Sequence, residues 1–297
     1  MAFFATQAAD SRQIQRNNAE TISITFFSGE TATDADGAVT IGIVDEAGNT
    51  VVASGTATTS AGSGVYTYSL AGQANLKKLT ATWSGTFSSN SMQFESLHEI
   101  VGGFYCSPYE VRQMDSIDGE TSAFPLADII ESIDWSERVV EDYIGTSYVH
   151  RYQRDVLDGT NEQSIRLTKM FPQKILTASI DGVALTAAEI NKIALYESGM
   201  IIREDDVWDY TIPGRKVIIE YEYGKTKQPP QDLVYVIKTL TRFNLINAYS
   251  RIPERATSIQ NEFGTVVLSQ PSMGRPTALP ELNVIINRHR QRPPVVG

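Results

Sequence analysis

The sequence predicts a multidomain α+β protein, because strand-forming and helix-forming stretches follow one another along the chain. Apolar and polar residues alternate in short runs over residues 21–97, which is typical of strands with one buried face. Apolar residues recur at helical spacing over residues 125–145 and again after Pro230, and a second strand-rich stretch, 164–224, lies between them. The 297 residues, 41% of them hydrophobic, are enough for two or three domains with their own cores.

Residues 1–20 show neither periodicity, so we interpret them as an N-terminal arm that becomes ordered only when a partner covers Phe3 and Phe4. Residues 21–99 contain short alternating runs separated by turn signals. This spacing favours a small antiparallel β-sandwich of immunoglobulin-like architecture. The disulfide of antibody domains is excluded, because Cys106 is the single cysteine of the chain.

Residues 100–163 are predicted to be mainly helical. Ser107 suits an N-cap, with Pro108 at the first helical position and Glu110 at the third. The apolar residues that follow at helical spacing run as far as Gly145, a residue type that favours the left-handed conformation at a helix end. One helix or two shorter ones should therefore fill residues 125–145.

Residues 164–225 are predicted to form a β-rich segment, within which Asp181-Gly182 between two apolar runs is a hairpin signal. Residues 226–262 hold a helix that begins after Pro230 and places its apolar residues on one stripe. The last region, 263–297, combines a short strand-like piece, a helical turn or two and a Pro-rich tail. We interpret it as an extended C-terminal arm.

The charge of the chain is unevenly distributed. Residues 1–160 carry 8 Lys and Arg against 21 Asp and Glu, whereas residues 226–297 carry 9 against 4. A mostly acidic body argues against nucleic-acid binding as the main task, since phosphate contacts need clustered cations. The basic C-terminal region suits either phosphate or an acidic protein surface, and we favour the protein surface. Its candidate contact residues are Arg275, Arg288, Arg290 and Arg292.

The sequence contains no motif with catalytic or metal-ligand spacing. His98, His150 and His289 lie in separate segments, and we interpret each as an ordinary surface or core histidine. Cys106 lacks a nearby activating histidine and is predicted to be structural. The acidic run Glu204-Asp205-Asp206 suits either a carboxylate or metal site or a solvated hairpin tip, of which the tip is favoured. We therefore predict no catalytic, cofactor-binding or metal residues and no enzyme.

Trp135 and Trp208 are predicted to be core anchors, with an interface role left open for Trp208. No apolar run approaches the ~20 residues of a membrane-spanning helix. The N-terminal residues lack the basic and apolar regions of a secretory signal, so we expect a soluble protein without a membrane partner. A single cysteine suits a reducing compartment.

The order of the later stretches suggests a family. The stretches are Leu126–Tyr148, Ile180-Asp181-Gly182-Val183, Trp208 to Gly224, Pro229–Ala248, Phe263–Leu268, Arg275-Pro276-Thr277 and Pro280–Arg288. Over roughly residues 104–290 this order resembles the head-to-tail adaptor (connector, or head completion) proteins of tailed bacteriophages. The fold class then becomes an N-terminal β-sandwich, an α-helical adaptor core that carries a β-rich insertion, and a C-terminal arm. The sandwich departs from the shortest family members.

The resemblance implies a structural role in the virion. Family members form a homo-oligomeric ring, commonly of twelve copies, beneath the portal of the filled head. They extend the DNA channel, to which DNA does not bind specifically, and present a surface for the next neck or tail component. The chain would be assembled in the host cytoplasm and would end in the neck of the virion. The resemblance assigns Arg275, Arg288, Arg290 and Arg292 to the portal contact.

A DNA conduit should repel phosphate, and an acidic wall does so within a Debye length of ~8–10 Å. We therefore predict that acidic residues of the helical region line the channel or its rim, namely Glu131, Glu137, Glu141 and Asp142. Two alternatives remain: an enzyme with an unrecognised site, and a host-surface or carbohydrate-binding virion protein. Exposed rings of Tyr66, Tyr68 and Trp83 on the sandwich would favour the second.

Overall fold

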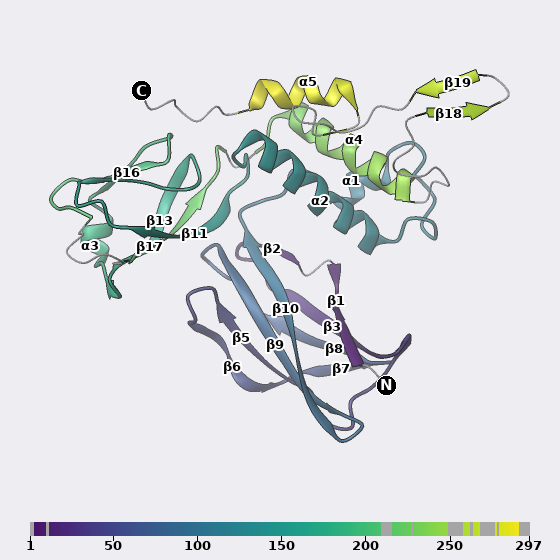
Figure 1. Cartoon of the computed structure of the whole chain (residues 1–297). Coiled ribbons are helices and arrows are strands. Elements are labelled where there is room, and N and C mark those ends of the chain that lie inside the picture. Colours follow the sequence, from purple (N-terminus) through teal and green to yellow (C-terminus); the bar gives the residue numbers. More distant parts are fainter. Residues whose placement is uncertain are drawn as a thin grey trace. The chain divides into compact units, whose positions relative to one another are not determined.

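The protein is described from a computed structural model. The structure describes residues 3–9, 12–208, 216–226, 228–248, 258–261, 264–267, 277 and 279–290. The chain divides into two compact units, which Figure 1 colours along the sequence. Unit 1 comprises Met1–Gly103, His150–Thr168 and Pro172–Tyr223, and unit 2 comprises Phe104–Val149, Lys169–Phe171 and Gly224–Gly297.

Unit 1 begins with two five-stranded sheets that form a sandwich. The first sheet has the order β1-β3-β8-β7, with β4 paired to β3. The second sheet has the order β2-β10-β9-β5-β6. The strands are β1 (Phe3–Gln7), β2 (Gln13–Gln15), β3 (Glu20–Ser28), β4 (Thr31–Ala32), β5 (Thr40–Asp45), β6 (Thr50–Ala57), β7 (Thr59–Gly62), β8 (Val65–Leu70), β9 (Lys77–Phe87) and β10 (Asn90–Val101).

The two sheets share one hydrophobic core, as the period-two pattern predicts. Ile22, Phe26, Ile41 and Trp83 are each at most 1% exposed within it. The indole N–H of Trp83 donates a hydrogen bond to Ser96 Oγ at 2.9 Å, so this buried donor is satisfied. The alternating strands are thereby confirmed, and the immunoglobulin-like architecture stays a prediction.

The N-terminal arm is an incorrect prediction for the described residues up to residue 20. Strand β1 pairs with β3, and β2 pairs in parallel with β10. The ring of Phe3 lies 5.7 Å from that of Phe87, and Phe4 stacks on Phe27 at 5.1 Å. Rings within the chain therefore contact both side chains, although Phe4 stays 45% exposed. Strands of three and five residues are too short to show a period.

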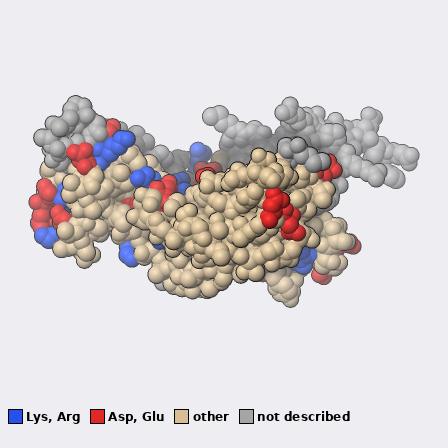
Figure 2. All heavy atoms as spheres, turned by 90° about the horizontal axis from the view of Figure 1, so that it is seen from below, with Lys and Arg blue, Asp and Glu red and all other residues tan. Residues whose placement is uncertain are grey.

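The sandwich surface is poor in charge. Residues 47–76 contain no Asp, Glu, Lys, Arg or His. Figure 2 shows a broad face of the molecule over which charged residues are sparse. Such a face offers no cation cluster for phosphate. Tyr66 and Trp83 are buried and Tyr68 is half-buried, so the exposed aromatic platform that would favour carbohydrate binding is not formed by these rings.

Unit 1 continues with a second strand-rich part. Its sheets have the orders β11-β17-β13-β14 and β12-β16-β15. The elements are β11 (Arg151–Asp158), β12 (Ser164–Arg166), β13 (Pro172–Ile180), β14 (Val183–Ala184), α3 (Ala187–Ile190), β15 (Ile193–Leu195), β16 (Met200–Arg203) and β17 (Lys216–Tyr223). The predicted Asp181-Gly182 hairpin is confirmed, because both residues have positive φ, 51° and 80°, between β13 and β14.

The predicted boundaries need two corrections here. Strand β11 lies inside residues 100–163, which were expected to be helical. The strand-rich part also belongs to the same compact unit as the sandwich. Arg16 forms a two-point ion pair with Glu222, at 3.2 and 3.0 Å, and Gly102 N–H donates to His150 O at 2.9 Å. Non-local pairs of this kind leave no periodic signal in the sequence.

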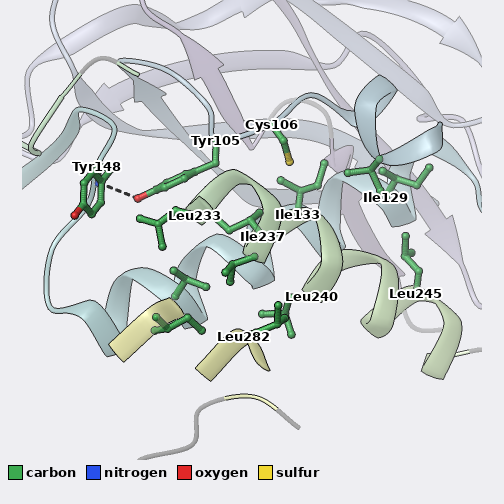
Figure 3. Packing of buried hydrophobic residues seen from close by; sticks show 14 of the residues in the cluster. Tyr105, Cys106, Ile129, Ile133, Tyr148, Leu233, Ile237, Leu240, Leu245 and Leu282 are labelled. Carbon is green, nitrogen blue, oxygen red and sulfur yellow. Dashed lines mark hydrogen bonds between the residues drawn. The ribbon is translucent and has the colours of Figure 1, made fainter. Parts of the chain in front are cut away.

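Unit 2 is a helical bundle with a shared apolar core (Figure 3). Its elements are α1 (Pro108–Arg112), α2 (Leu126–Ile144), α4 (Gln231–Ala248), β18 (Ser258–Asn261), β19 (Gly264–Val267) and α5 (Pro280–His289). The predicted start of α1 is confirmed as a full capping box between Ser107 and Glu110. The predicted end of α2 is confirmed by Gly145, whose φ is 82°.

Helices α2 and α4 meet along a seam of small polar residues. Ser132 Oγ donates to the carbonyl oxygen of Thr241 at 3.2 Å, and Thr241 Oγ1 donates to Ser136 Oγ at 3.1 Å. Asn244 Nδ2 donates to Ser132 Oγ at 3.1 Å. Short side chains let the two backbones approach, and the hydrogen bonds fix the register of the pair.

Candidate functional site

A polar cluster of unit 2 that joins several segments lies where α5 packs on the bundle. His289 Nε2 lies 2.7 Å from Asp232 Oδ2, and His289 Nδ1 lies 2.7 Å from Tyr148 Oη. Nε2–H donates to the carboxylate whether the ring is neutral or protonated, and Nδ1 accepts from the phenol only when the ring is neutral. Lys225 Nζ donates to Tyr148 Oη at 3.3 Å. We call Asp232, His289, Tyr148 and Lys225 the α5 clamp.

Helix α5 reaches the clamp because its apolar residues repeat at helical spacing. Leu282 and Ile286 are fully buried in the bundle core, and Pro280 occupies the first turn. Asn283, within α5, binds Thr277, which lies before the helix. Its Oδ1 accepts from the backbone N–H and the hydroxyl of Thr277, at 3.1 and 3.0 Å. Helix α5 is therefore part of the core, which corrects the predicted extended arm of residues 263–297 for its helical portion.

Tyr148 links the clamp to the rest of the bundle. Its backbone N–H donates to Tyr105 Oη at 2.8 Å, the bond drawn in Figure 3. The ammonium of Lys225 lies 4.8 Å from the centroid of the Tyr148 ring and 4.7 Å from that of Phe171. One cation thus contacts both rings, and the clamp joins the segment after α2 to α4 and α5.

The clamp combines a hydroxyl, an imidazole and a carboxylate, which are the residue types of a catalytic triad. Burial, and then the charge of Asp232, raise the pKa of Tyr148 above its ordinary value. A raised pKa keeps the phenol protonated and so disfavours the phenolate form. Among the residues that the structure describes, no three His, Cys, Asp or Glu side chains gather as a metal site.

The four arginines predicted to contact a portal have different positions. Arg288 is exposed on the outer side of α5. Arg290 is exposed just after the helix, with its guanidinium 4.8 Å from the centroid of the Tyr143 ring. Arg275 and Arg292 lie outside the described residues. The structure thus gives a position to Arg288 and Arg290 alone.

The four acidic residues predicted to line a channel lie on two sides of α2. Glu131 and Asp142 are exposed. Glu137 is 1% exposed and accepts a hydrogen bond from Tyr105 N–H at 3.2 Å, so the prediction that it lines a channel is wrong. Glu141 is half-buried and accepts from Ser147 Oγ at 2.5 Å. Helical spacing places Glu137 on the core side of α2. The hydrogen bond from Tyr105 N–H offsets the cost of burying its carboxylate there.

Two tryptophans have opposite positions. Trp208 is fully buried in the strand-rich part of unit 1, which confirms it as a core anchor. Trp135 is 45% exposed on α2, which contradicts its predicted place in the core. Its neighbours on the helix surface are Glu131 and Arg138, both exposed. An exposed indole surrounded by charges is typical of an interface anchor.

The other residues considered as possible site residues have ordinary environments. Burial, with the nearby charge of Glu137, raises the pKa of Cys106 to about 12, so its thiol is inert and structural as predicted. His98 is buried in the sandwich with its Nε2 2.9 Å from Ser96 Oγ. The acidic run 204–206 is exposed, and Asp205 and Asp206 pair with Lys192 and Arg203. These ion pairs fit the predicted solvated tip.

The α5 clamp was not found from the sequence. Asp232 and His289 are 57 residues apart, and Tyr148 is 141 residues from His289. No spacing rule connects positions so distant in the chain. The signal that was available is the helical repeat of Leu282 and Ile286 just before His289, which places that histidine at the end of an amphipathic helix.

We expect the clamp to weaken in acid. Burial raises the pKa of Asp232, but the hydrogen bond and charge of His289 and the Leu233 N–H outweigh it and hold that pKa below its ordinary value. A carboxyl with a lowered folded-state pKa adds stability above its unfolded pKa of about 4, and that stability is lost as the pH falls through the folded value. The Tm difference between wild type and Asp232→Asn should therefore be largest near pH 6 and shrink as the pH falls below about 4. A difference that is unchanged over this range would contradict the assignment.

No family model matches the sequence, and no curated protein matches it. Among solved structures, the chain is similar to a protein in the neck of an empty GTA particle computed with C6 symmetry. That match has 15% identity and a TM-score of 0.45, and covers 65% of this chain and 93% of that chain. A protein in the virion of a native gene transfer agent (GTA) particle matches with 14% identity, a TM-score of 0.45 and the same coverage. TM-scores this low do not establish a shared fold.

A third match is to a protein in the neck of a native GTA particle computed with C12 symmetry. It has 14% identity and a TM-score of 0.40, and covers 60% of this chain and 94% of that chain. Separately, no helix in the described part of the chain has the length and apolar character needed to cross a bilayer.

Proposed function

We propose that the protein is a structural component of the neck of a tailed-phage-type particle, a head-to-tail adaptor that forms a ring beneath the portal. The supporting observation is the helical bundle of unit 2. Helices α2 and α4 pack together although residues 145–230 separate them, and α5 closes the same core. This is the order of helices and intervening strands on which the sequence resemblance to the adaptors depends.

The portal contact in this proposal is the basic segment at and after the end of α5. Arg290 is the best-placed described residue, because it follows the helix and is exposed. Arg288 and the undescribed Arg275 and Arg292 complete the proposed set. Guanidinium groups form strong two-point hydrogen bonds with carboxylates, which suits an acidic portal surface.

The channel wall in this proposal receives the exposed carboxylates of α2, Glu131 and Asp142. Exposed carboxylates repel the phosphates of passing DNA over ~8–10 Å. Glu137 is excluded by its burial, and Glu141 by the bond that its carboxylate already accepts. The ring, of twelve copies in the family, would pass DNA without binding it, and its far side would receive the next neck or tail component.

The experiment compares negative-stain images of the purified protein with and without portal, together with a variant that stops after Arg290. The stop keeps α5, whereas a deletion from residue 271 would remove two buried core residues, Leu282 and Ile286. We expect a ring or a portal-bound collar for the full chain. The shortened variant, which lacks Arg292 and the tail, should keep its circular dichroism spectrum and bind portal about tenfold more weakly. A full chain that stays monomeric and ignores portal would contradict the proposed function.

A further inference from the structure

Two outer helix faces of unit 2 carry exposed apolar residues with no core to explain them. On α2, Trp135 is 45% exposed, and on α5, Val284 is 55% exposed. Both residues point away from the bundle, because each helix buries its opposite side. Helix α2 buries Ile133 and Val140, and helix α5 buries Leu282 and Ile286. Exposed aromatic and aliphatic side chains within a charged rim are the usual centre of a protein interface.

The charges beside these two residues have the same order along their helices, acidic before the apolar residue and basic after it. On α2, Glu131 lies one turn before Trp135 and Arg138 lies just after it. On α5, Glu281 lies just before Val284 and Arg288 lies one turn after it. All four charged residues are exposed. A helix rises 1.5 Å per residue, so the axial offsets match on both helices, about 6 Å to Glu131 and Arg288 and about 4.5 Å to Arg138 and Glu281.

We propose that α2 of one copy packs antiparallel against α5 of a second copy, with Trp135 and Val284 at the same level. In that register Glu131 faces Arg288 and Arg138 faces Glu281, so both charge pairs are attractive. A parallel arrangement would instead place Glu131 beside Glu281 and Arg138 beside Arg288, and like charges oppose it. The charge pattern therefore selects the orientation.

The two faces belong to different helices and share no residue, so the contact is head-to-tail. A head-to-tail interface leaves one face open at each end of a dimer, and it closes into a ring when the rotation per copy permits. This inference rests on the proposed function and deepens it by naming the surface between neighbouring copies. It moves Glu131 from the proposed channel wall, and Arg288 from the proposed portal set, to that surface, and leaves Arg290 for the portal.

The first test reverses the charges in the full chain. Glu131→Arg and Arg288→Glu each put like charges together, so each should weaken self-association about tenfold or more, measured by analytical ultracentrifugation or as rings on portal. The double variant exchanges the two signs and should restore association. Asp118→Arg, a reversal of an exposed carboxylate in the segment before α2, is the control and should leave association nearly unchanged.

The second test uses cysteine cross-linking, for which the native Cys106 is silent because it is buried. Trp135→Cys and Val284→Cys chains, mixed and oxidised, should give disulfide-linked dimers, whereas either chain alone should not. Dimers from one variant alone would mean a symmetric contact and would overturn the inference. If wild type forms rings on portal while Glu131→Arg does so equally well, the inference fails and the proposed function stands. If wild type never associates with itself or with portal, both fail.

Discussion

Asp155→Ala should destabilise unit 1 by about 3–5 kcal/mol, because it would leave several buried donors without an acceptor. Asp155 is 3% exposed on β11 and its carboxylate accepts four hydrogen bonds. The donors are Thr168 N–H at 2.7 Å, Thr168 Oγ1 at 2.6 Å, Tyr221 Oη at 2.9 Å and Gln153 Nε2 at 3.0 Å. Chemical denaturation followed by tryptophan fluorescence measures the loss, since Trp208 lies in the same part of the unit.

The matched control is Asp158→Ala, which removes an exposed carboxylate from the end of the same strand. A surface change of this kind should stay within about 0.5 kcal/mol of wild type. Asp155→Asn keeps the shape but turns an amide donor toward groups that are themselves donors, so it should also destabilise. Equal stabilities for Asp155→Ala and Asp158→Ala would show that the network does not hold the sheet β11-β17-β13-β14 to the segment around Thr168.

Features set by neighbouring residues could be predicted from the sequence. The capping box at Ser107, the left-handed Gly145 and the Asp181-Gly182 turn each depend on a few adjacent residues, and all three are present. Alternation likewise predicts the sandwich strands, because burying one face of a sheet requires a period of two. Trp208 was placed in the core because a large apolar ring has few other low-energy positions.

Features set by distant residues could not be predicted. The strand β1 depends on β3 and on rings such as Phe87, which belong to later parts of the chain. Trp135 has a large apolar side chain of the kind found in cores, and only the packing of α2 shows that this side chain faces outward. Glu137 was expected to be exposed but is buried, because its hydrogen-bond donor, Tyr105 N–H, is 32 residues away in the sequence. The candidate site shares this limit, since every contact of the α5 clamp joins separate segments.

The double variant Leu282→Ala, Ile286→Ala should detach α5 from the bundle. Both side chains are fully buried in the core of unit 2, and each truncation of a buried Leu or Ile costs about 2–5 kcal/mol. The clamp alone should not hold the helix, because the carboxylate of Asp232 is 43% exposed and such ion pairs contribute little. Hydrogen exchange should therefore show lost protection over residues 280–289.

This variant also connects the fold to the proposed function. If α5 positions the basic segment for the portal, detaching it should abolish portal binding even though Arg288 and Arg290 remain in the chain. Val284→Ala is the matched control for stability, because it truncates an exposed aliphatic residue of the same helix and should cost less than about 0.5 kcal/mol in the monomer. Normal portal binding by the double variant, with α5 unprotected, would mean that the arginines act as a flexible chain and that the docked helix has another purpose.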